Sequence, residues 1–114
     1  MDEAKARALL AAARERVEKA LGEHRGRVDD GEITGIDQHL ADQATELYTE
    51  EFEAGQRERL QDELAAIERA EARLEEGKYG LSVESGDPIP DERLEAVPWA
   101  ERTAEEQSRY DGRR

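Results

Sequence analysis

The sequence predicts a mostly α protein: a long antiparallel helical hairpin (a coiled coil), then a small compact module and a C-terminal helix. Ala, Glu, Lys, Leu and Arg make up 65 of the 114 residues, a composition typical of long helices and coiled coils. Apolar residues recur at heptad-like spacings before residue 77. All three prolines lie between residues 88 and 98, so no proline interrupts the helical part of the chain.

The chain is also strongly charged, with a formal net charge of −13 and only 19 Leu, Ile, Val and Phe residues. Disordered proteins have a similar composition. The heptad spacing favours folded helices over disorder, because a regular apolar stripe on a helix is a surface for burial.

The first helix is expected from about Asp2 to Val28. Acidic residues at its start and arginines near its end complement the helix dipole. The apolar stripe follows a 7-4-7 spacing through Leu10, Val17, Leu21 and Val28. Two aspartates and two glycines within residues 29–36 then predict a loop. Asp37 is expected to cap the next helix by accepting hydrogen bonds from free backbone N–H groups.

The second helix is expected from about Gln38 to Glu76. Its stripe has a 4-3-4-3 rhythm with one polar member, through Leu60, Leu64, Ile67, Glu71 and Leu74. Gly77 is placed to end this helix as a C-terminal capping glycine. Because neither helix can bury its stripe alone and the connection is short, the two helices should pair as an antiparallel hairpin over residues 1–77.

The acidic stretch, residues 29–54, contains nine acidic residues and no Lys or Arg. It therefore holds more than half of the net charge. Such a field attracts cations or a basic surface, although a solvated acidic helix end would have the same composition. The overall acidity argues against direct DNA binding, because the chain has no large positive surface to displace counterions.

The chain changes character after Gly77. Leu81 and Val83 alternate with polar residues, which predicts a short strand or hairpin. A last helix is expected from Trp99 to about Tyr110. Trp99, Tyr79 and Tyr110 should form an aromatic cluster against the base of the long helix.

The segment 77–100, GKYGLSVESGDPIPDERLEAVPWA, resembles the zinc finger of the DksA/TraR family, in which two C-x-x-C pairs bind the metal. The four cysteine positions here hold Ser82, Ser85, Thr103 and Glu106. Hydroxyls are not practical zinc ligands, and one carboxylate cannot hold zinc alone. The resemblance therefore implies a degenerate zinc-finger-like module over residues 78–114 that folds without metal. Hydrogen bonding among Ser82, Ser85 and Thr103, together with packing of Trp99, would replace the zinc, or these are ordinary turn and helix residues.

A second resemblance lies near the hairpin tip, at about residues 29–44. Family members that act on bacterial RNA polymerase carry a D-x-x-D-x-A motif there and insert the tip into the enzyme's secondary channel. Asp42 and Ala44 match the second half of this motif. His39 takes the place of the first aspartate, and Asp37 lies two residues earlier. The resemblance thus implies a transcription regulator whose polymerase-contacting residues are Asp37, His39, Asp42 and Ala44.

Other functions are less consistent with the sequence. It contains no glycine-rich phosphate loop, no metal-binding His pair and no nucleophile beside a base, so we do not expect an enzyme. No cofactor is expected, and a role for ppGpp as a co-effector stays open. With no cysteine, no secretory signal and no membrane-spanning run, we expect a cytoplasmic monomer. The alternative is a coiled-coil interaction or dimerisation module that has lost polymerase regulation. Arg93 is expected to pair with an acid inside the module.

Overall fold

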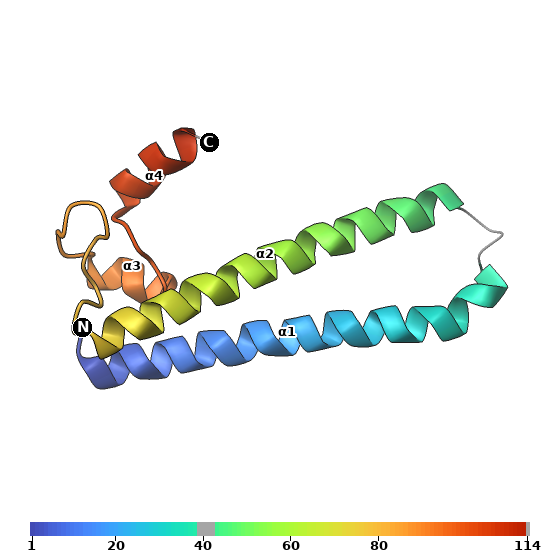
Figure 1. Ribbon diagram of the computed structural model, residues 1–114, viewed down its shortest axis with the longest axis horizontal. Coiled ribbons are helices and arrows are strands. Elements are labelled where there is room, and N and C mark those ends of the chain that lie inside the picture. Colours follow the sequence, from blue (N-terminus) through green and yellow to red (C-terminus); the bar gives the residue numbers. More distant parts are fainter. Residues whose placement is uncertain (39–42, 114) are drawn as a thin grey trace. The chain divides into compact units, whose positions relative to one another are not determined.

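The computed structural model describes residues 1–38 and 43–113, with side chains for residues 1–23 and 50–113. Within these ranges the chain forms α1 (Glu3–Gln38), α2 (Gln43–Glu75), α3 (Asp91–Ala96) and α4 (Ala104–Gly112), as Figure 1 shows. The mostly α fold class is confirmed. None of the helices in the described ranges is apolar enough over the required length to span a bilayer.

The chain divides into two compact units. The first unit combines Met1–Arg14 with Ala65–Arg114, and the second unit comprises Glu15–Leu64. Each long helix therefore contributes one segment to each unit.

The first unit contains the base of the hairpin, where the start of α1 and the end of α2 lie side by side in opposite directions (Figure 1). Leu10 and Ile67 are almost fully buried there, which confirms the predicted apolar stripes. The remaining buried positions of this base are Ala6, Ala13, Ala70 and Leu74. Arg7 pairs with Glu75 at 2.8 Å across the two helices, so charged side chains cover the edge of a narrow, alanine-rich core.

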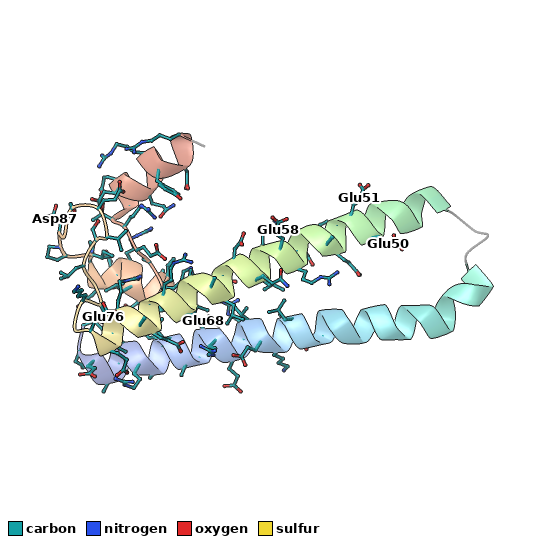
Figure 2. All side chains as sticks on the ribbon, in the orientation of Figure 1. Glu50, Glu51, Glu58, Glu68, Glu76 and Asp87 are labelled. Carbon is teal, nitrogen blue, oxygen red and sulfur yellow. The ribbon has the colours of Figure 1, made fainter. Side chains whose placement is uncertain are left out.

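In the second unit the two helical segments also run antiparallel. Arg16 Nη2 lies 3.3 Å from Glu63 Oε1, and Val17 is fully buried. Glu50, Glu51 and Glu58 of α2 are exposed (Figure 2). This part of α2 thus has a solvated acidic surface.

The predicted loop at residues 29–36 is wrong, because α1 continues through these residues to Gln38. A glycine inside a helix costs about 1 kcal/mol relative to alanine, far less than the roughly 3 kcal/mol of proline. Gly31 and Gly35 are therefore compatible with a continuous helix. Asp37 is itself helical and α2 begins at Gln43, so the prediction that Asp37 is the N-cap of the second helix is also wrong.

Gly77 ends α2 as the sequence predicts. Its φ angle is +75°, a left-handed conformation that glycine adopts without steric cost. Its N–H donates to the carbonyl of Leu74 at 3.2 Å, and the N–H of Lys78 donates to the carbonyl of Arg73 at 2.8 Å. These two bonds form a Schellman motif, which satisfies carbonyls at the helix end and turns the chain into the finger-like module.

The finger-like module (residues 78–114) begins with a reversal of the chain. Leu81 and Pro88 form an isolated antiparallel β-bridge, so the predicted strand or hairpin is reduced to one bridge. The N–H of Ile89 donates to the carbonyl of Gly80 at 2.7 Å. The short helix α3, which the sequence analysis did not predict, then covers a small core of Ile89, Leu94 and Ala100.

The structure gives a partner for two of the three aromatic residues that were predicted to cluster, and the cluster itself stays a prediction. Tyr79 packs against the small core and donates its hydroxyl to the carbonyl of Pro98 at 2.7 Å. Tyr110 is instead 37% exposed, and its ring lies beneath the guanidinium of Arg102. The last helix also starts later than predicted, at Ala104 rather than Trp99.

Candidate functional site

Three hydroxyl residues of the finger-like module surround the carboxylate of a fourth residue, Glu106. We call Ser82, Ser85, Thr103 and Glu106 the hydroxyl–carboxylate cluster. Glu106 is only 7% exposed, and its Oε1 accepts the backbone N–H of Thr103 at 2.9 Å. The hydroxyls of Ser82 and Ser85 also stabilise the charged form of this carboxylate. Together these donors, with the Thr103 N–H first, lower the pKa of Glu106 to about 2.

Ser82 links this carboxylate to the turn that precedes α3. Its Oγ accepts the backbone N–H groups of Glu84 at 3.1 Å and Ser85 at 3.2 Å. A hydroxyl has one donor and two acceptor sites, so these two N–H groups take both acceptor sites and leave the donor available to the carboxylate. Gly86, with φ +77°, supplies the left-handed residue that closes this turn. Ser82, which is only 5% exposed, is therefore one of the residues that hold this turn together.

Thr103 and Glu106 also form the start of α4. Thr103 Oγ1 accepts the backbone N–H of Glu106 at 3.2 Å, while the Glu106 carboxylate accepts the N–H of Thr103. This reciprocal pair is a capping box. The T-x-x-E spacing of residues 103–106 is the sequence signature of this motif, which was not among the predictions. The predicted hydrogen bonding among Ser82, Ser85 and Thr103 is present between the two serines, because Ser82 Oγ accepts the N–H of Ser85. Thr103 bonds to Glu106 instead.

The hydroxyl–carboxylate cluster does not fit a zinc ion. Zinc sites in proteins use thiolate, imidazole and carboxylate ligands, usually four of them. Here both acceptor sites of Ser82 are taken by backbone N–H groups, and the Glu106 carboxylate already accepts the N–H of Thr103. Among the described residues, no three His, Asp or Glu side chains are grouped so that they could hold a metal ion. The cluster is a hydrogen-bonded substitute for a metal site rather than a metal site.

A charged network surrounds the link between Ala100 and α4. Arg69 of α2 lies 2.6 Å from Glu101, and Arg102 lies 3.1 Å from Glu84. The guanidinium of Arg102 sits 3.8 Å from the centre of the Tyr110 ring, which is a cation–π contact. Arg93 donates its Nε–H to the carbonyl of Arg102 at 2.9 Å. The expected acidic partner of Arg93 is therefore wrong: this arginine holds the chain through a main-chain oxygen.

The residues predicted at the hairpin tip are placed only in part. Asp37 lies near the end of α1 and Ala44 near the start of α2. His39 and Asp42 lie outside the described residues. The contact role predicted for these four residues thus remains a prediction.

The finger-like module is similar to a known family of zinc fingers. The family model of the prokaryotic DksA/TraR C4-type zinc finger matches residues 83–112. The uncharacterized protein YteA of Bacillus subtilis is 44% identical over 79 residues, which are 66% of this chain and 31% of that protein. The RNA polymerase-binding transcription factor DksA of Caulobacter vibrioides is 38% identical over 74 residues, which are 65% of this chain and 52% of that protein. The chain thus spans about half or less of the length of these curated relatives.

The structural similarity covers more of this chain than the sequence alignments do. The solved structure of transcription factor DksA2 from Pseudomonas aeruginosa matches 97% of this chain and 84% of its own, with a TM-score of 0.81 and 28% sequence identity. The match includes the hairpin as well as the finger-like module. The finger segment, the relatives and the fold together show that the chain belongs to the DksA/TraR family, as a member without cysteines.

Proposed function

We propose that this protein is a transcription regulator that binds bacterial RNA polymerase and inserts its acidic hairpin tip into the secondary channel. The observation that carries the proposal is the match of nearly the whole chain to the transcription factor DksA2, with a TM-score of 0.81. The DksA relative from Caulobacter vibrioides is described as RNA polymerase-binding. The regulator acts in the cytoplasm as a monomer, without catalytic activity of its own and without direct DNA binding.

The charge pattern supports this role. Nine acidic residues and no Lys or Arg lie between residues 29 and 54, and this stretch contains the connection between α1 and α2. Glu50 and Glu51, in the described part of it, are exposed. Carboxylates carried on a helical hairpin can reach basic side chains or a bound Mg²⁺ in a deep channel.

The direct test of insertion is photo-crosslinking with RNA polymerase from the same organism. A photo-crosslinking amino acid replaces His39, and the crosslinked polymerase peptide is identified by mass spectrometry. We expect a peptide near the catalytic centre. The matched control carries the same amino acid at Gln61, an exposed position of α2, and should not label that peptide. A protein that folds but does not bind polymerase would overturn the proposal and favour the interaction or dimerisation module.

The role of the tip is tested by Asp42→Asn in a transcription assay. We expect this variant to bind polymerase but to lose most of its effect on transcription, because the change removes one carboxylate without shortening the side chain. Asp62→Asn makes the same change at an exposed position of α2 and should keep the parental effect. Equal activity of the two variants would contradict a function for Asp42.

A further inference from the structure

The helix α4 is attached to the finger-like module in an unusual way. Among its nine residues, Glu106 is the buried one. No apolar side chain of α4 is buried, and Tyr110 is 37% exposed. A helix of this length is marginal in water without packing against the rest of the protein. The attachment of α4 therefore depends on polar contacts rather than on apolar burial.

These polar contacts converge on Glu106. Its carboxylate accepts the N–H of Thr103, which starts α4. The carboxylate is buried, as is Ser82 of the turn before α3, and the hydroxyls of Ser82 and Ser85 stabilise its charged form. One side chain thus caps the helix and also joins it to the rest of the module. A further contact of α4 is the cation–π interaction of Arg102 with Tyr110, in which the guanidinium lies 3.8 Å from the centre of the ring.

The small core does not need this side chain. Ile89, Leu94 and Ala100 pack with one another and with Met1, Tyr79 and Val97. Lys5 of α1 pairs with Glu95 of α3 at 2.7 Å. These contacts bind α3 to the hairpin base without passing through α4.

We propose that Glu106 is a latch: its buried carboxylate holds α4 on the finger-like module, and α4 detaches as a unit when the carboxylate is removed, while α3 and its core stay folded. The α4 helix can then separate from the finger-like module without unfolding α3. The proposal does not depend on the partner of the protein, because it concerns only contacts within the first unit.

Hydrogen exchange read by mass spectrometry on the full chain tests the latch. In Glu106→Ala, exchange of the α4 amides should accelerate by about tenfold or more, since a capping bond and two hydroxyl contacts are lost together. Glu106→Gln keeps an acceptor for the capping box but loses the charge, so its effect should be intermediate. In both variants the peptide that contains Ile89 and Leu94 should keep its parental exchange.

Glu105 provides the matched control. It is the neighbouring acid in the first turn of α4, and it is exposed. Glu105→Ala and Glu105→Gln make the same changes of charge and size and should leave α4 protected. Trypsin adds a second readout, because Arg109 lies inside α4 and its peptide bond should become cleavable in Glu106→Ala.

Two results would overturn the latch. Parental protection of α4 in Glu106→Ala would show that other contacts hold the helix. Simultaneous loss of protection around Leu94 would show that Glu106 supports the whole module. If Glu106→Ala does not fold, the single variant Ser85→Ala decides the question, since it removes one hydroxyl next to the carboxylate and leaves the capping box and the turn bonds of Ser82 in place. We expect faster exchange in α4 of that variant, and unchanged exchange would likewise reject the latch.

Discussion

Thr103 and Glu106 bond each other reciprocally: Glu106 Oε1 accepts the N–H of Thr103 at 2.9 Å, and Thr103 Oγ1 accepts the N–H of Glu106 at 3.2 Å. These residues stand at the two positions where the family resemblance implies the second C-x-x-C pair. The spacing of three residues between two zinc ligands is also the spacing of a capping box. A metal-binding pair at the start of a helix can therefore be replaced by a pair that caps the helix.

The buried carboxylate makes the stability of the module depend on acid. The N–H of Thr103, with the hydroxyls of Ser82 and Ser85, lowers the pKa of Glu106 from 4.5 to about 2. Since the folded protein binds this proton more weakly than the unfolded chain, the contribution of Glu106 is complete above pH 4.5 and is lost as the pH falls toward 2. Urea denaturation across this range should show that loss. The loss should shrink in Glu106→Gln and persist in Glu105→Gln, and an equally steep loss in Glu106→Gln would contradict the assignment.

Chelators should leave the stability of this protein unchanged, because its hydroxyl–carboxylate cluster offers no zinc site. The measurement is the melting temperature with and without a strong chelator. The informative comparison is a variant with cysteine at positions 82, 85, 103 and 106. Because these positions meet around one point, the variant should bind about one zinc ion per chain and become sensitive to the chelator. Destabilisation of the parent by the chelator would show that a metal supports its fold.

Two glycines of the hairpin should respond to alanine in opposite directions. Gly77 has φ +75°, so Gly77→Ala should destabilise the protein by about 1 kcal/mol through backbone strain. Gly55 lies inside α2, and a Cβ there would meet no atom within 4 Å. Gly55→Ala should therefore stabilise the protein by about 0.5 to 1 kcal/mol. Urea denaturation of both variants measures the difference, and a stabilising Gly77→Ala would contradict the Schellman cap.

Local patterns were sufficient for much of the hairpin. The spacing of Leu10, Ile67 and Leu74 predicted the buried stripes, because helical periodicity places these residues on one face whatever follows in the chain. Gly77 was predictable for a similar reason, since one residue with a left-handed conformation ends a helix locally. The loop at residues 29–36 was predicted wrongly because composition overstated the effect of two glycines, which a helix tolerates at modest cost.

The sequence by itself determined the mostly helical hairpin, its apolar stripes, the resemblance to the DksA/TraR finger and the absence of cysteine ligands, because each of these is a property of neighbouring residues or of composition. Only the tertiary structure decided what stands in place of the metal. Ser82 and Glu106 are far apart in the sequence, and neither residue reveals the other. Their contact exists because the turn after Gly80 and the start of α4 fold against each other, and that approach buries a carboxylate among donors that satisfy it.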